Sequence, residues 1–222
     1  MGKVRAAFFD AAGVLYHRDA STEERVARLL AERGYATTLG DDAARRRGQL
    51  RESATLGQIT ADDCWSGVLV LHGVVDESER RSLVEKITGL ADEIVPDAAA
   101  RPVLGELRRR GLLVGVITDT MYGLARKRRW LERAGVAELV SVVACSTEVG
   151  VRKPDPAIYG YALERAGLTA AESAFVGHAA TELAGARAVG MRSVAVHPDP
   201  GADADVTVGS LRELLDLSLF QP

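Results

Sequence analysis

The sequence predicts an α/β fold, with a three-layer core in which a parallel sheet carries helices on both faces and one all-helical block is inserted after the first strand. Short apolar runs alternate with amphipathic helical segments, which is the pattern of a covered parallel sheet. Between about residues 21 and 91 this alternation stops and only helical patterns occur. Polar residues directly follow several apolar runs, at the edge where parallel sheets bind ligands.

Four apolar runs predict the strands of the sheet. In chain order they are Lys3 to Phe9, Leu112 to Ile117, Ser173 to Val176 and Ser193 to Val196. Helix start signals lie between the runs, because Ser or Thr followed three residues later by Glu forms a capping box, and proline fits the first turn of a helix. These signals are Thr169 with Glu172, Ser210 with Glu213, and Arg101-Pro102 ahead of a helix that ends near Gly111.

The inserted block contains four helical patterns, the first of them behind a capping box formed by Ser21 and Glu24. The four patterns span Thr22 to Gly34, Asp41 to Ala54, Thr60 to Gly73 and Asp76 to Leu90. Helices inserted at the ligand-binding edge of a sheet are typical of a lid. We therefore expect a core of residues 1–15 and 94–222 and a helical cap of residues 16–93.

The composition argues against several classes of protein. Of the 222 residues, 47% are hydrophobic and 27% charged, as in ordinary globular proteins and unlike disordered chains. The longest apolar runs are too short to span a bilayer and the N-terminus lacks the apolar segment of a signal peptide, so we expect a cytoplasmic protein without membrane contact. The net charge of −3 argues against nucleic-acid binding, and basic runs such as Arg126 to Arg129 are typical of solvated helix faces.

A single carboxylate stands at the end of the first predicted strand. In "AFFDAAGVLYH", residues 7–17, Asp10 follows the apolar run and precedes a glycine-containing turn. Thr118, Asp119 and His178 take the same place after the second and third runs. Because the carboxyl ends of parallel strands share one edge of the sheet, we expect these side chains to meet there. A turn-capping role for Asp10 alone would not account for its companions.

These segments give the chain a resemblance to the haloacid dehalogenase (HAD) superfamily, in which four short motifs at strand ends build one site. The motifs are Asp10 to Leu15, Thr118 in "VITDT", Lys153 in "VRKPDPAIY", and Phe175 to Met191, "FVGHAATELAGARAVGM". They occur in the order of the family, and the helical block stands where helical-cap members place their cap. The resemblance implies a HAD-like Rossmannoid core with an all-α cap and an enzyme that acts on a small anionic substrate.

The resemblance also implies a role for each matching position. Asp10 is the nucleophile, and Lys153 supplies the positive charge that keeps it ionised. The Thr118 hydroxyl binds an anionic oxygen of the substrate. The backbone N–H groups around Ala11, Ala12 and Asp119 complete the binding site for the anion.

Two motifs depart from the phosphatases of the family. Phosphatases carry an acid two residues after the nucleophile, which protonates the leaving group and then activates water, and Ala12 can do neither. Their fourth motif has two aspartates, the first of which binds Mg²⁺, whereas this chain has His178 and Glu182. Mg²⁺ prefers oxygen ligands, so we expect a site with no metal and no other cofactor. Zn²⁺ or Fe²⁺, which imidazole suits, is the less favoured alternative.

Several site candidates keep two interpretations. His178 is either a general base, since imidazole changes charge near neutral pH, or a remnant in a site no longer used for chemistry. Tyr16 and His17, where the chain enters the cap, and Tyr122, after the second motif, are candidates for substrate contact or for linker and packing roles. Asp119 is a further candidate acid or the cap of the following helix.

The favoured function is a metal-independent enzyme, with two branches. In dehalogenase-like hydrolysis, Asp10 attacks carbon and Glu182 or His178 positions water. In the other branch a bound sulfate or phosphate is displaced or eliminated, with Thr118 and Lys153 stabilising the leaving group. HAD-like proteins of specialised metabolism that form aziridine rings by eliminating sulfate are an analogy for this branch at the level of the fold.

Other functions stay open. One is a catalytically silent subunit that binds a protein partner or a second copy of the chain. Another is an ordinary phosphatase, which the loss of the acid at Ala12 disfavours. Phosphonoacetaldehyde hydrolases share that alanine, but the cap stretch from Gly48 to Trp65 lacks the lysine with which they form a Schiff base.

Overall fold

The computed structural model describes residues 4–221, and its core is a six-stranded sheet in the order β5-β4-β1-β6-β7-β8. Every neighbouring pair in this sheet is parallel. The strands are β1 (Ala6–Phe9), β4 (Leu113–Thr118), β5 (Val142–Cys145), β6 (Ser173–Gly177), β7 (Arg192–Val196) and β8 (Val206–Val208). An antiparallel pair, β2 (Tyr16–His17) and β3 (Val95–Pro96), connects the core to the inserted helices.

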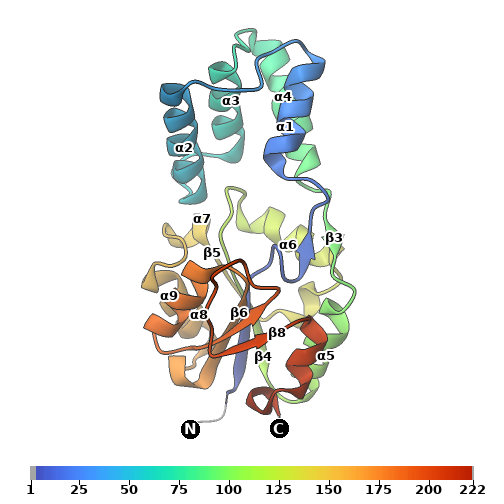
Figure 1. Cartoon of the computed structure of the whole chain (residues 1–222), viewed down its shortest axis with the longest axis vertical. Coiled ribbons are helices and arrows are strands. Elements are labelled where there is room, and N and C mark those ends of the chain that lie inside the picture. Colours follow the sequence, from blue (N-terminus) through green and yellow to red (C-terminus); the bar gives the residue numbers. More distant parts are fainter. Residues whose placement is uncertain (1–3, 222) are drawn as a thin grey trace.

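The helices form two groups, which Figure 1 shows one above the other. The upper group is the inserted block, α1 (Thr22–Glu32), α2 (Asp41–Thr55), α3 (Ala61–Leu71) and α4 (Glu77–Leu90). The core carries α5 (Ala100–Arg109), α6 (Leu124–Arg133), α7 (Ser146–Val149), α8 (Pro156–Ala166) and α9 (Ala180–Ala188). Short 3₁₀ turns occupy Ala137–Leu139, Ala170–Glu172, Leu211–Asp216 and Ser218–Phe220. No described helix is long and apolar enough to cross a membrane.

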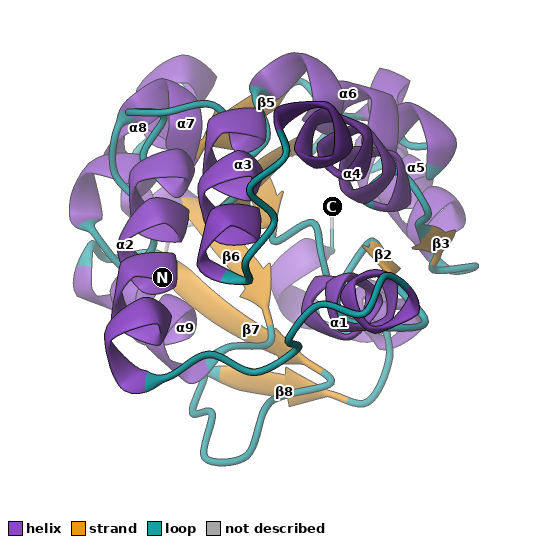
Figure 2. Cartoon of the chain, turned by 90° about the horizontal axis from the view of Figure 1, so that it is seen from above, coloured by secondary structure: helices purple, strands orange, loops and turns teal. Residues whose placement is uncertain are grey.

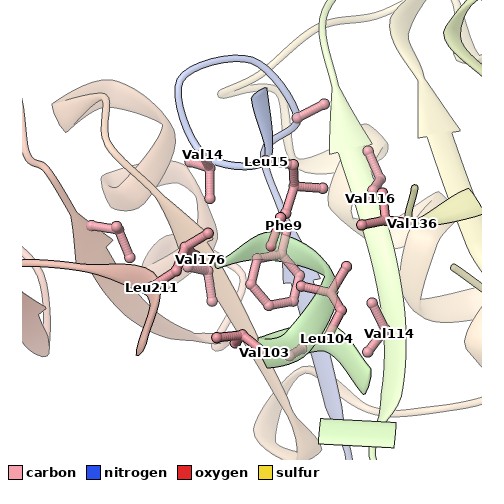
Figure 3. Close-up of a cluster of buried hydrophobic side chains, with 14 of the residues drawn as sticks. Phe9, Val14, Leu15, Val103, Leu104, Val114, Val116, Val136, Val176 and Leu211 are labelled. Carbon is pink, nitrogen blue, oxygen red and sulfur yellow. The ribbon is translucent and has the colours of Figure 1, made fainter. Parts of the chain in front are cut away.

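Helices cover both faces of the sheet, as seen from above in Figure 2. The residues of β1 are buried without exception and alternate between the faces, because successive side chains of a strand point to opposite sides. Phe8 packs in the cluster that includes residues of α8 and α9, and Phe9 in the cluster that includes residues of α5 and α6. Figure 3 shows Phe9 among Val103 and Leu104 of α5 and Val176 of β6. Burial of this kind contributes about 1.5–3 kcal/mol for each large apolar side chain and fixes the strand that carries Asp10.

The inserted helices have a hydrophobic cluster of their own. Trp65 and Leu69 of α3 and Leu83 of α4 are buried in it together with residues of α1. The start of α3 is fixed by a capping box, in which Thr60 and Asp63 satisfy each other's backbone N–H groups. The block therefore folds around its own apolar interior, and its first helix also begins behind the expected box of Ser21 and Glu24.

Several contacts connect the inserted helices to the core above the sheet. The indole N–H of Trp65 donates to the hydroxyl of Tyr122 at 3.1 Å. Arg152 Nε lies 3.1 Å from Glu52 Oε1. Gly57, at a φ of +72°, lies so close to the carbonyl oxygen of Thr147 that a Cβ there would be 2.3 Å away. These contacts join α3, α2 and the loop between them to the segments that follow β4 and β5.

Three of the four predicted runs match strands to within one residue at each end, and the first run matches β1 at its end, but the prediction missed the strands at the two edges of the sheet. The strands β5 and β8 lie outside the four predicted runs, since they are short and border turns. The box of Thr169 and Glu172 is present, but it opens a 3₁₀ turn rather than a helix, because β6 begins at the next residue. Ser210 likewise precedes a 3₁₀ segment. The predicted first strand begins at Lys3, which lies outside the described residues.

Candidate active site

The carboxyl ends of three adjacent strands bring the candidate residues together. Asp10 follows β1, Thr118 ends β4 and His178 follows β6, and β1 lies between the other two strands. The backbone N–H of Asp10 donates to Val176 O at 2.8 Å, which continues the β1–β6 pairing to the residue that carries the carboxylate. Asp10 is only 7% exposed. The candidate residues thus lie at one edge of the sheet, beneath the inserted helices, which is where the sequence analysis expected them to meet.

The two oxygens of Asp10 have different surroundings. Oδ1 accepts hydrogen bonds from Lys153 Nζ and from the backbone N–H of Ala11, both at 2.8 Å. Oδ2 accepts no hydrogen bond from another described residue, and Nε2 of the His178 imidazole lies 3.7 Å from it. One oxygen is therefore held by two donors and the other is free to react.

Lys153 joins two carboxylates inside the protein. Its Nζ lies 2.8 Å from Asp10 Oδ1 and 2.8 Å from Glu182 Oε2, and its side chain is 1% exposed. Burial alone acts to lower the pKa of Lys153, but the carboxylates of Asp10 and Glu182 outweigh it and raise that pKa. Lys153 is therefore a permanent positive charge at the site. The backbone of Glu182 is also fixed, because the Tyr159 hydroxyl donates to the backbone carbonyl oxygen of Glu182 at 2.7 Å.

Two carboxyl groups near Lys153 have raised pKa values. Burial raises the pKa of Asp119, although Lys153 acts in the opposite direction. Burial also raises the pKa of Glu182, again opposed by Lys153. Asp119 accepts a hydrogen bond from the backbone N–H of Lys153 at 3.1 Å, whereas α6 begins after Gly123, so Asp119 does not cap the helix that follows. The structure thus excludes the capping role and leaves Asp119 as a carboxyl group that keeps its proton more readily than usual.

Several donors at the carboxyl ends of β1 and β4 have no hydrogen-bond partner among the described residues. The Thr118 hydroxyl and the backbone N–H groups of Ala12 and Asp119 form no hydrogen bond with another described part of the chain. Thr118 is nevertheless 1% exposed, so its hydroxyl is held within the site rather than on the surface. Hydroxyl and backbone donors of this kind suit the oxygens of an anion. The Ala11 N–H differs from this expectation, because Asp10 Oδ1 already occupies it.

His178 lies over the turn that follows Asp10. A Cβ added to Gly13, whose φ is +82°, would come within 2.7 Å of His178 Nε2, so only glycine leaves room for the ring. On the opposite side of the ring, Nδ1 lies 3.1 Å from Asp199 Oδ1. The imidazole is thus clamped between the turn after β1 and the segment after β7, with Nε2 directed at Asp10.

The donor set does not fit the Mg²⁺ that the phosphatases of the family use. Asp10 Oδ2 has no hydrogen-bond donor among the described residues, Ala12 adds no side-chain oxygen, and His178 offers an imidazole nitrogen at the position of the phosphatases' first aspartate. Glu182 Oε2 is bound to the ammonium of Lys153. Mg²⁺ demands near-octahedral oxygen coordination. Across residues 4–221 no three His, Cys, Asp or Glu side chains are arranged to hold a metal ion.

The three remaining candidates form no side-chain hydrogen bond or ion pair with Asp10 in residues 4–221. Tyr16 is buried, with its hydroxyl accepting from Lys127 Nζ at 2.9 Å and its ring against Trp130, so it has the packing role. His17 is exposed on β2, where it pairs with Val95. Tyr122 is the hydrogen-bond partner of Trp65 at the contact with the inserted helices, and burial raises its pKa.

Sequence reasoning missed two residues near the site. Asp199 follows β7, which neighbours β6, so the strand-end rule that found His178 also points to it. Lys127 is 2% exposed, which corrects the expectation that its basic run is wholly solvated. Its spacing to Trp130 and Leu131, three and four residues on, is the signal that it shares their buried face.

Comparison with known proteins agrees with this architecture. The family model of haloacid dehalogenase-like hydrolases matches residues 4–190. A phosphoserine phosphatase of Thermus thermophilus is 39% identical over 127 residues, 54% of this chain and 49% of that protein. A phosphatase of Mycobacterium tuberculosis is 42% identical over 46% of this chain and 45% of its own. The chain thus spans about half the length of these two curated relatives.

Other similarities extend over the whole chain. A glyceraldehyde 3-phosphate phosphatase of Methanopyrus kandleri is 28% identical over 96% of this chain and 97% of that protein. Among solved structures, a 2-haloacid dehalogenase from Pseudomonas syringae has a TM-score of 0.71 at 22% identity and covers 96% of this chain and 97% of its own, which is a likeness of fold. With the family model matching most of its length, the chain belongs to the haloacid dehalogenase-like hydrolases.

Proposed function

We propose that the protein is a metal-independent hydrolase in which Asp10 displaces a leaving group from a carbon atom of a small anionic substrate. The observation that carries this proposal is the unequal treatment of the two Asp10 oxygens. Oδ2 is free, whereas Oδ1 is held by the Lys153 ammonium and the Ala11 N–H. That arrangement suits a carboxylate that becomes an ester and is then hydrolysed at its own carbonyl carbon.

In the first step Asp10 Oδ2 attacks the substrate carbon. A C–O bond forms, the bond from that carbon to the leaving group breaks, and the leaving group departs with the electron pair. The anionic part of the substrate is bound by the Thr118 hydroxyl and the N–H groups of Ala12 and Asp119, which lack partners among the described residues. Holding nucleophile and substrate together in this way converts a bimolecular step into an effectively unimolecular one.

The missing acid restricts the leaving group. Ala12 cannot deliver a proton, so a group that departs as a stable anion, such as halide or sulfate, is favoured over an alkoxide. Phosphate monoester hydrolysis expels an alkoxide and gains most from a proton donor. Burial raises the pKa of Asp119, so this carboxyl group is a candidate substitute for the missing acid. In the proposed reaction Asp119 does not protonate the leaving group.

In the second step water hydrolyses the Asp10 ester. His178 Nε2 lies 3.7 Å from Asp10 Oδ2, close enough for one water molecule to contact both groups. The base takes a proton from this water as its oxygen bonds to Cγ, and negative charge develops on Oδ1. Lys153 and the Ala11 N–H already surround that atom, which is the arrangement of an oxyanion hole. The bond from Cγ to Oδ2 then breaks, and His178 returns the proton to the departing alcohol.

A second candidate function is the displacement or elimination of a bound sulfate or phosphate. Two observations support this candidate. The curated relatives are named as phosphatases, and the donors at Thr118, Ala12 and Asp119 suit a tetrahedral anion. In this branch His178 removes a proton from the substrate while the anion departs, and Asp10 forms no bond to the substrate. The two branches differ in whether Asp10 becomes covalently modified.

An assay with chelator separates the proposal from its rivals. The chain is incubated with EDTA and short 2-halocarboxylic acids or alkyl sulfates, and in parallel with an aryl phosphate with and without Mg²⁺. We expect release of halide or sulfate in EDTA, and its loss in Asp10→Asn. Turnover of the phosphate alone, and only with Mg²⁺, would contradict the proposal. Absence of any turnover together with stable capture of a second protein would favour the silent binding subunit.

A further inference from the structure

Asp199 contacts His178 twice. Its carboxylate oxygen Oδ1 lies 3.1 Å from the ring atom Nδ1. Its backbone N–H donates to the carbonyl oxygen of His178, also at 3.1 Å. An ionised carboxylate can only accept a hydrogen bond, so the ring proton belongs on Nδ1. The lone pair of the neutral ring then lies on Nε2, the atom that faces Asp10.

The segment that carries Asp199 is held in an unusual conformation. His197, two residues before it and directly after β7, has a φ of +47°, the one positive φ outside glycine among the described residues. The backbone N–H of Ala202 donates to Asp199 O at 3.0 Å and closes the turn on the other side. Non-glycine residues in this region of φ/ψ space cost about 1–3 kcal/mol and persist where the surrounding structure requires them. Here the turn directs the carboxylate of Asp199 at His178.

We propose that Asp199 is a positioning residue that fixes the Nδ1–H tautomer of His178 and so leaves Nε2 free to accept a proton from water. This inference rests on the proposed function, in which His178 is the base. It adds a role for a residue that touches neither the substrate nor Asp10. A carboxylate that orients the opposite nitrogen of a catalytic histidine serves the same purpose in hydrolases built on unrelated folds.

The charges around the ring support the same assignment. When Nε2 takes the proton, the ring becomes an imidazolium flanked by two carboxylates, Asp10 beside Nε2 and Asp199 beside Nδ1. The charge of Lys153 is shared by Asp10 and Glu182. Asp199 therefore stabilises the positive charge that His178 acquires as the base. The ring becomes neutral again when it gives the proton to the departing alcohol.

The test compares Asp199→Asn with a matched control. The side-chain amide of the variant can turn its NH₂ group toward Nδ1, which would move the ring proton to Nε2. Asp203→Asn removes a carboxylate from the same segment that pairs with Arg187 and does not touch His178. The tautomer is measured by long-range ¹H–¹⁵N NMR on protein labelled at its four histidines, with the His178 signals assigned from His178→Gln.

We expect the Nδ1–H tautomer in the wild type and in Asp203→Asn, and the Nε2–H tautomer in Asp199→Asn. Turnover in the latter should fall about 10- to 100-fold, a part of what a general base contributes, with an unchanged melting temperature. Identical His178 signals in the wild type and Asp199→Asn would overturn the inference, even if the protein is an active hydrolase. The NMR result does not depend on turnover, so a tautomer change in a protein that hydrolyses nothing would refute the proposed function and leave the positioning contact standing.

Discussion

Lys153 Nζ lies 2.8 Å from Asp10 Oδ1 and 2.8 Å from Glu182 Oε2, so one buried ammonium holds together a carboxylate that directly follows β1 and a carboxylate from α9. Replacing Lys153 by Met leaves both carboxylates without their cation. Removing one partner of a buried charge pair costs about 3–5 kcal/mol, and we expect a loss of that size in the free energy of unfolding at pH 7, measured by urea denaturation.

A second substitution tests whether the loss at Lys153 comes from the charges. Lys153→Met/Glu182→Gln has one uncompensated carboxylate fewer and should recover part of the stability. Equal stability of Lys153→Met and the wild type at pH 7 would show that the ammonium does not hold the site together.

Gly13→Ala should displace His178. The added Cβ would lie 2.7 Å from Nε2, and the positive φ of +82° costs about 1–2 kcal/mol for a residue with a side chain. Gly34→Ala is the matched control, since it has a φ of +75° with nothing within 4 Å of the added Cβ. We expect a similar loss of stability in both variants but loss of turnover in Gly13→Ala alone. Full activity in Gly13→Ala would argue against a base at this position.

Asp119→Asn should change how stability depends on pH. Burial raises the pKa of Asp119 in the folded protein above its unfolded value of about 3.9. The folded state therefore favours the protonated carboxyl, and this contribution to stability is complete below about pH 4 and is lost as the pH rises through the folded pKa. The wild type should consequently lose more stability than Asp119→Asn between pH 4 and neutral pH, in urea titrations at each pH.

The exposed Asp203, with 79% of its side chain accessible, provides the control for this pH series. Asp203→Asn should follow the wild-type curve. A stability difference between the wild type and Asp119→Asn that stays constant with pH, or changes in the opposite direction, would contradict the raised pKa.

Tyr122→Phe should loosen the contact between the inserted helices and the core. The substitution leaves the Trp65 indole N–H, now bonded at 3.1 Å, without its acceptor. An unsatisfied buried donor costs about 1–3 kcal/mol. We expect a loss in that range and faster amide hydrogen exchange in α3. Tyr161→Phe removes a hydroxyl without a hydrogen-bond partner in residues 4–221 and should change neither. Unchanged exchange in Tyr122→Phe would mean that this bond does not hold the contact.

The strand-end rule recovered much of the candidate site from the sequence. Asp10, Thr118 and His178 follow apolar runs, and the topology of a parallel sheet brings such positions to one edge. Lys153 could be placed only through its motif, because it reaches the site from the loop after α7 rather than from a strand. The sequence does not indicate that Oδ1 of Asp10 accepts two hydrogen bonds while Oδ2 accepts none, because this difference depends on side-chain geometry.

The errors have physical causes. Lys127 belongs to a basic run, which favours a solvated face. It is buried because it shares one face of α6 with Trp130 and Leu131, and its ammonium donates to the Tyr16 hydroxyl. Asp199 follows a strand that was predicted, yet its "HPDPG" context resembles an ordinary surface turn. Its importance becomes visible only when β7 is known to lie beside β6.

Turnover in heavy-oxygen water, followed by mass spectrometry of the peptide that contains Asp10, tests the central claim most directly. If Asp10 attacks carbon and water then attacks its Cγ, the peptide gains the mass of one heavy oxygen, and the Asp10→Asn protein gains none. Label found only in released inorganic phosphate would indicate phosphoryl transfer. An unlabelled Asp10 peptide after complete conversion of the substrate would contradict the covalent route.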